Sequence, residues 1–216
     1  MTDYYEKYIK YKTKYQRMKD NCIKYNYYFI HGTRDVNNLK SILHDGFIYP
    51  GKDVDIKRRF QSGGQPMDDI YANIYFDDLR NLDYVWDYAI ILHPQLLYEY
   101  NTTFNKAWGG KFGRIHINKA DNNKTISTKL RHIRNFFKNP NALPETFNKF
   151  PEYFKHEVVF INPDPIPLMN NLLGIICNKC SQSQIKELHR IARNNGYPDI
   201  KIISSSDILP TLDELL

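Results

Sequence analysis

Long apolar runs and frequent cysteines are both missing from this chain. No stretch approaches the about 18 consecutive apolar residues that a membrane-spanning helix needs, and Met1–Ile9 is too polar for a secretory signal. Three cysteines in 216 residues, an odd number, fit a reducing compartment better than a disulfide framework. We therefore expect an intracellular protein that neither crosses a membrane nor is secreted.

Clusters of metal-binding residues are also scarce. Cys177 and Cys180 have the spacing of a zinc-binding pair, but a second pair is absent and only His189 lies nearby in the sequence. Structural zinc ions usually take about four protein ligands. We expect no metal at this position and instead two buried thiols at the end of a strand.

Apolar residues are plentiful enough for a packed core. Hydrophobic residues make up 42% of the chain, and 216 residues without repeats or a linker are most simply one domain. Strand and helix patterns alternate, which predicts an α/β (α+β) domain over residues 26–216. The expected strands are 27–31, 70–76, 89–93, 157–161 and 200–203, and the expected helices are 36–45, 79–88, 124–138 and 182–194. Residues 100–123 show neither pattern and are expected to be irregular.

Residues 1–25 form a basic, tyrosine-rich leader. Seven of its residues recur four and three positions apart, as in a helix with one narrow apolar stripe: Tyr4, Tyr8, Tyr11, Tyr15, Met18, Cys22 and Tyr25. The leader carries +4 of the net charge of +6. We expect an N-terminal helix packed on its own domain. The alternatives are self-association through the tyrosine stripe and a basic arm for nucleic acid.

A second basic stretch runs from Lys124 to Lys138 and contains no acidic residue. Ile126, Leu130 and Ile133 recur at helical spacing, so one face of the expected helix packs on the domain. The other faces carry basic side chains, among them Lys129, Arg131, His132, Arg134 and Lys138. We expect a packed helix with a solvated basic face, and a face that follows nucleic-acid phosphates is the alternative.

The strand expected at 27–31 delivers a histidine and a glycine at its end. The helix that follows is capped by Asp35 and ends at Gly46, so His31 and Gly32 are held between two packed elements. Glycine leaves the backbone N–H and C=O accessible to a flat ligand. Such an arrangement is typical of a binding or catalytic site.

Three motifs, in this order, resemble those of the poly(ADP-ribose) polymerase-like ADP-ribosyltransferases of the His-Tyr-Glu type. His31–Gly46, beginning His-Gly-Thr-Arg, resembles the first motif; Asn73–Asp78, reading Asn-Ile-Tyr-Phe-Asp-Asp, resembles the second; and His156–Phe160, reading His-Glu-Val-Val-Phe, resembles the third. The resemblance spans roughly residues 27 to 177. It implies a split, mostly antiparallel sheet of the ADP-ribosyltransferase fold.

The resemblance also implies roles in binding NAD. His31 would hydrogen-bond the adenosine-side ribose, the backbone of Gly32 would hold the nicotinamide carboxamide, and Thr33 would add a hydroxyl contact. Tyr75 would stack on nicotinamide or its ribose, with Trp86 as the second stacking ring.

Lys57, Arg58 and Arg59 lie where the family has a loop that covers NAD, and a solvated basic loop is the alternative reading.

Glu157 is the expected catalytic residue, together with His31 and Tyr75. The bond to be broken joins nicotinamide to ribose, and positive charge spreads over the sugar in the transition state. A carboxylate under that ring would stabilise this charge. The alternative is an edge-strand glutamate that faces water.

Two positions depart from the family pattern. Asn73 replaces the usual glycine before Ile-Tyr-Phe, and Asp83 replaces a serine that helps to hold the carboxamide. Tyr84 and Tyr88 compete with Trp86 as the second stacking ring, because the phase of the expected helix is not fixed by the sequence.

The resemblance therefore implies an NAD-dependent mono-ADP-ribosyltransferase, with NAD as co-substrate and a macromolecular acceptor that is more often protein than nucleic acid. A nucleic-acid-directed transferase, an NAD glycohydrolase and an inactive binding protein of the same fold are the alternatives. The leader resembles those of proteins from giant DNA viruses similar to mimivirus, which would place the protein in the cytoplasm of an infected cell or in a virion.

Overall fold

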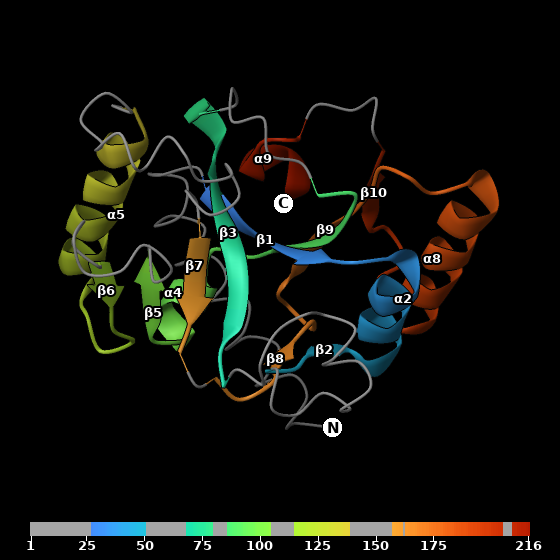
Figure 1. Cartoon of the computed structure of the whole chain (residues 1–216), viewed down its shortest axis with the longest axis horizontal. Coiled ribbons are helices and arrows are strands. Elements are labelled where there is room, and N and C mark those ends of the chain that lie inside the picture. The colour runs from blue at the N-terminus through green and yellow to red at the C-terminus, as the bar shows by residue number, and fades with distance from the viewer. Residues whose placement is uncertain are drawn as a thin grey trace, which may run out of the picture.

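The computed structural model describes residues 27–50, 68–79, 86–104, 115–138, 157–161, 163–204 and 209–216. Their centre is an eight-stranded sheet in the order β10-β9-β4-β1-β3-β7-β5-β6 (Figure 1). Within these ranges β10 and β9 pair in parallel, and each other neighbouring pair of this sheet is antiparallel. The expected α+β class with a mostly antiparallel sheet is thereby confirmed.

The strands of the large sheet vary from three to seven residues in length. They are β1 (Tyr27–Thr33), β3 (Ile70–Phe76), β4 (Tyr88–Leu92), β5 (Thr102–Phe104), β6 (Ile115–Ile117), β7 (Glu157–Phe160), β9 (Leu172–Cys177) and β10 (Lys201–Ile203). A separate two-stranded sheet pairs β2 (Phe47–Ile48) with β8 (Ile166–Pro167). The helical elements are α2 (Val36–Asp45), the 3-10 helix η2 (Asp77–Leu79), α4 (Leu96–Glu99), α5 (Asn123–Lys138), α8 (Gln182–Asn194) and α9 (Leu212–Leu215).

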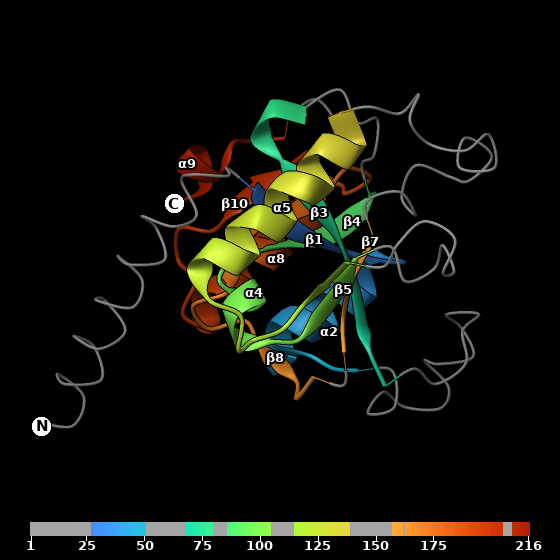
Figure 2. The same cartoon turned by 90° about the vertical axis from the view of Figure 1, so that its left-hand side faces the viewer.

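The two faces of the large sheet are covered differently. One face forms the main core with apolar residues of α2, α4, α5 and α8, including Leu39, Leu97, Leu130 and Leu188. Figures 1 and 2 show α5 at one end of the sheet and the α2–α8 pair at the other. The opposite face carries a smaller core, completed by Leu212 of α9 and neighbouring C-terminal residues.

Local sequence signals explain where the helices begin and end. Asp35 caps α2 by accepting hydrogen bonds from two backbone N–H groups, and Gly46 ends the helix in the left-handed region at φ 73°. Ser181 and Gln184 form a capping box at the start of α8. Both helices have the bounds expected from the sequence.

The structure corrects the expectations for two other segments. The predicted helix 79–88 does not extend through its C-terminal part, because Trp86 and Asp87 are irregular and Tyr88 begins β4. The segment expected to be irregular, 100–123, contains β5 and β6, which are three residues each. Strands so short give little alternation and are stabilised by their pairing with β7 and with each other.

Several expectations fall outside the described residues: the leader 1–25, the basic residues Lys57–Arg59, and both Asp83 and Tyr84. Within the described ranges, no helix is long and apolar enough to span a membrane. In the same part of the chain, no group of three or more His, Cys, Asp or Glu side chains could hold a metal ion.

Candidate active site

Near the centre of the sheet, strand β3 changes its pairing partner at Asn73, and we call this point the split of the sheet. The first half of β3, up to Asn73, pairs with β7, whereas its second half, from Asn73 onward, pairs with β1. Asn73 is thus the residue of β3 that has partners on both sides, Ile30 on β1 and Glu157 on β7. Neighbouring strands lie about 4.8 Å apart, so Ile30 and Glu157 are separated by about 10 Å across the sheet.

One face of the split carries Gly32, Asn73, Tyr75 and Glu157. Residues opposite each other in a sheet point to the same face, and successive residues alternate. Ile30, Asn73 and Glu157 form one such row, and Gly32 and Tyr75 lie two positions further along their strands. This is the face of the smaller core, which includes Ile30 and Tyr75.

Glu157 is buried, with 7% of its surface exposed, and Asn73 beside it is 6% exposed. β7 lies between β3 and β5, so Glu157 is on an internal strand. The alternative of an edge-strand glutamate facing water is therefore wrong. Burying a carboxylate is costly unless it is hydrogen-bonded or ion-paired, so Glu157 is not an ordinary surface glutamate.

Trp86 lies directly on Gly32. A Cβ atom built on Gly32 would be 2.2 Å from two carbons of the indole ring, where no real contact is possible. The indole Nε1–H donates to the Oδ1 atom of Asn73 at 3.3 Å. The ring thus covers the part of this face between the end of β1 and Asn73, and glycine at position 32 is required by the ring above it.

The backbone at Trp86 is held by the turn that follows β9. The Nδ2 atom of Asn178 donates to the Trp86 carbonyl at 2.9 Å, and the Asn178 N–H donates to the Asp87 carbonyl at 2.8 Å. Cys177 and Cys180 flank this turn with a Cα–Cα distance of 5.4 Å. The structure brings their side chains together at the end of β9, where Cys177 is buried.

Tyr75 lies on the same face as Gly32 but is not its neighbour across the strands. Its partner on β1 is Tyr28, four residues before Gly32, and the two tyrosine rings stack with centroids 4.9 Å apart. Tyr75 is 5% exposed, and the Tyr28 hydroxyl donates to the Pro210 carbonyl at 3.0 Å. The structure therefore packs Tyr75 beneath the C-terminal segment rather than beside Gly32.

His31 and Thr33 alternate with Gly32 and belong to the opposite face. The Nδ1 atom of His31 lies 2.7 Å from the Tyr71 carbonyl, which can only accept, so Nδ1 carries the proton. Burial lowers the pKa of His31, and the Tyr71 carbonyl offsets this in part. The neutral ring leaves Nε2 as an acceptor. The Thr33 hydroxyl lies within 3.4 Å of the Tyr88 carbonyl, to which it can donate.

The structure thus places Gly32, Trp86 and Glu157 of the expected site on one face of the sheet, while the side chains of His31, Thr33 and Tyr75 contact other partners. Sequence reasoning missed the role of Asn73, which it treated only as a departure from a family pattern. The sequence did hold a hint, because Asn73 is an amide side chain inside an otherwise apolar and aromatic strand, and buried amides are usually hydrogen-bonded.

Two acidic residues outside the basic helix α5 pair with three of its five lysine and arginine side chains. Asp121 pairs with Lys129 at 2.6 Å, and Asp78 pairs with Arg134 and, at 2.8 Å, with Lys138. The Arg134 side-chain hydrogen bond lowers the pKa of Asp78 to about 2. Among the described residues, no acid pairs with Arg131. Two carboxylates thus offset part of the positive charge of this helix.

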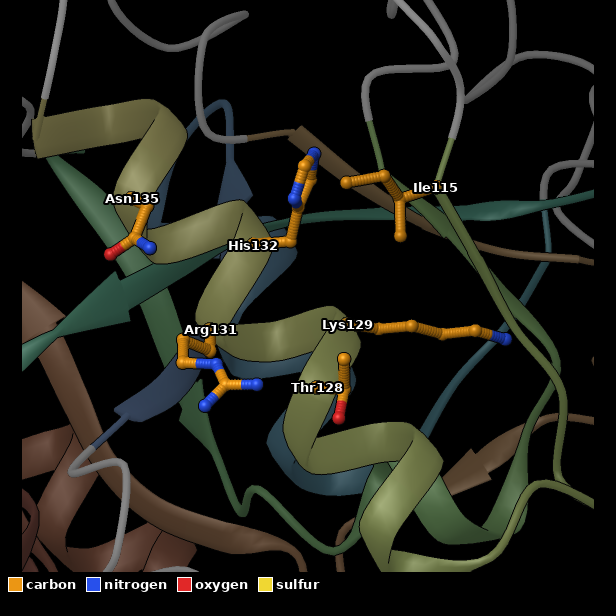
Figure 3. Close-up of a pocket in the computed structure, with 6 residues that line it drawn as sticks. All are labelled: Ile115, Thr128, Lys129, Arg131, His132 and Asn135. Carbon is orange, nitrogen blue, oxygen red and sulfur yellow. The ribbon is translucent and has the colours of Figure 1, made fainter.

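A shallow pocket of about 330 Å³ lies on α5 and β6 (Figure 3). It is lined by Ile115, Thr128, Lys129, Arg131, His132 and Asn135. In Figure 3, Lys129 and His132 extend toward the β6 side of the helix and Arg131 toward the other side. This pocket lies apart from the split at Asn73 and shares no residue with it.

Together the split sheet, the buried glutamate and the glycine covered by an indole define an α+β protein with a candidate site at the centre of its sheet. Residues 24–140 match the family of unknown function DUF5846, and the chain belongs to this family. A relative, "Uncharacterized protein R11" of Acanthamoeba polyphaga mimivirus, is 40% identical over 232 residues, covering 99% of this chain and 85% of the relative. The organism of this relative agrees with the giant-virus resemblance of the leader.

Two solved structures are similar to the chain at low sequence identity. Thermus sp. 2.9 DarT in complex with carba-NAD+ aligns with a TM-score of 0.48 and 14% identity over 86% of this chain and 98% of that chain. Thermosipho africanus DarTG in complex with ADP-ribose aligns with a TM-score of 0.43 and 13% identity over 82% of this chain and 49% of that chain.

Proposed function

We propose that the protein is an NAD-dependent mono-ADP-ribosyltransferase that cleaves the bond between nicotinamide and ribose. The observation that carries the proposal is the row at the split of the sheet, where Glu157 lies two strands from the end of β1, on the same face as Gly32. The sequence motifs that resemble the His-Tyr-Glu transferases supply these same residues.

The residues present fit an NAD molecule in two respects. The surface above Gly32 is shaped for a flat ring, since an indole already occupies it and a Cβ atom would not fit beneath it. Glu157 is a buried carboxylate on the same face, able to stabilise positive charge that develops on the ribose as nicotinamide leaves. Gly32 would hold the carboxamide and Trp86 would stack on the nicotinamide ring.

A protein is the better candidate acceptor. Three of the basic side chains of α5 are engaged by Asp78 and Asp121, which leaves fewer charges for phosphate contacts than the sequence indicated. Non-specific nucleic-acid binding depends mainly on such contacts. If water is the acceptor instead, the protein is an NAD glycohydrolase. The experiment below distinguishes this activity from transfer to protein.

The test is incubation of the full chain with NAD labelled in the adenylate part, in the presence of separate pools of host-cell protein, DNA and RNA. The proposal predicts release of nicotinamide and transfer of label to protein, with single ADP-ribose units. Label found only as free ADP-ribose would indicate a glycohydrolase. Label on oligonucleotides would reject the protein acceptor, and absence of nicotinamide release would reject the function itself.

A further inference from the structure

Trp86 occupies the position that a ligand ring would need. Its indole rests on the Cα atom of Gly32 so closely that a Cβ atom there would be 2.2 Å from the ring. A planar group cannot pass between an indole and the backbone on which it already packs. A ligand that reaches the backbone of Gly32 from this face therefore requires the indole to move.

The indole is held in this position from two sides. Its Nε1–H donates to the Oδ1 atom of Asn73 at 3.3 Å, and its own backbone carbonyl accepts from Asn178 at 2.9 Å. The contact with Asn178 holds the backbone from which the side chain starts, and the hydrogen bond to Asn73 holds the end of the ring. Asn73 is itself rigid, because it is 6% exposed and paired on both sides within the sheet.

Asn73 also connects this ring to the carboxylate. It is the direct cross-strand neighbour of Glu157, and side chains opposite each other in an antiparallel pair are within contact range. One amide side chain therefore lies between the ring over Gly32 and the expected catalytic glutamate. A glycine at this position, as in the resembled family, would offer no such acceptor.

We infer that Asn73 is a positioning residue that keeps Trp86 closed over Gly32, and that this hydrogen bond must break before the nicotinamide end of NAD can bind. The inference rests on the proposed function. It assigns Asn73 a role in ligand entry, distinct from the bond cleavage assigned to Glu157. The apparent affinity for NAD is then reduced by the fraction of molecules in which the ring is closed.

The test uses the full chain with Trp108→Phe, in which Trp86 is the remaining tryptophan. Acrylamide quenching of its fluorescence reports whether the ring is exposed, and calorimetry reports NAD binding. Asn73→Leu removes the acceptor at similar volume, and Asn73→Asp, the matched control, retains an oxygen at the same place. Asn73→Ala provides the same test if Asn73→Leu does not fold.

We expect Asn73→Leu to increase quenching of Trp86 and to tighten NAD binding by about two- to tenfold, the effect of one neutral hydrogen bond. Asn73→Asp should leave quenching near that of the parent protein. In the Trp86→Phe background the indole N–H is gone, so Asn73→Leu should no longer change NAD affinity.

The inference is overturned by unchanged quenching in Asn73→Leu, or by the same gain in affinity in the Trp86→Phe background. Weaker NAD binding in Asn73→Leu would also overturn it, since Asn73 would then hold the ring ready for the ligand. If NAD affinity is unchanged in Asn73→Leu, the inference is rejected but the proposed function is not. If neither the parent nor the variant binds NAD, the proposed function and the inference both fail.

Discussion

Gly32→Ala should destabilise the protein through one side chain, Trp86. The added Cβ atom would be 2.2 Å from two indole carbons, whereas carbon atoms in contact are usually about 3.5 Å apart, so the ring must move by more than about 1 Å. The ring is the rigid part of the side chain, and its hydrogen bond to Asn73 is already 3.3 Å long. We therefore expect that hydrogen bond to be lost.

The cost has two parts. Overpacking a well-filled site costs about 1–3 kcal/mol, and a lost neutral hydrogen bond costs about 1 kcal/mol. For a chain of this size each kcal/mol lowers Tm by about 2–4 °C, so we expect Tm to fall by at least about 4 °C. Differential scanning calorimetry measures the shift, and tryptophan emission in the Trp108→Phe background reports the displaced ring.

Gly174→Ala is the matched control on the same sheet face. Its Cβ atom would be 3.3 Å from the terminal methyl groups of Ile91 and Leu215, which can give way easily. We expect this variant to lose less than about 1 kcal/mol. If Gly32→Ala is as stable as Gly174→Ala and leaves the emission of Trp86 unchanged, the ring does not lie on Gly32 and the account of the site is wrong.

Two further predictions concern charge. On α5, Arg131→Gln should reduce the slope of log affinity against log salt for DNA by about 0.9, the value for one phosphate contact, whereas Arg134→Gln should change it less, because Arg134 is engaged by Asp78. Equal slopes in filter-binding titrations would contradict this difference. Burial lowers the pKa of His93 from 6.5 to about 4, so below pH 6.5 the unfolded chain binds a proton that the folded chain does not. The free energy of unfolding should therefore fall by about 3 kcal/mol between pH 6.5 and pH 4, with a slope of at most 1.36 kcal/mol per pH unit. In urea titrations over this pH range, His93→Asn should show a smaller fall.

The sequence predicts the elements of the site better than their arrangement. β1, β3, β7 and the capped helix α2 lie where the apolar patterns and the capping residues place them. Patterns of this kind depend on neighbours in the chain. The division of β3 between two partners at Asn73 depends on pairing between segments far apart, which no local pattern records.

The same limit explains the errors. Trp86 was expected on a helix but lies just before β4, where contacts with Asn178, 92 residues away, fix its backbone. The register that pairs Tyr75 with Tyr28, four residues before Gly32, likewise could not be read from local patterns. The α5 helix looked strongly basic because Asp78, which pairs with Arg134, lies 56 residues earlier in the chain.

The central claim is that Glu157 stabilises the charge that develops as nicotinamide leaves NAD. The most direct measurement is the rate of nicotinamide release by the full chain and by its Glu157→Gln variant, with Glu99→Gln on α4 as the control. The account predicts that Glu157→Gln retains its fold and NAD binding but loses about 10²–10⁴ in rate, while Glu99→Gln remains fully active. Equal rates in the parent protein and in Glu157→Gln would contradict it.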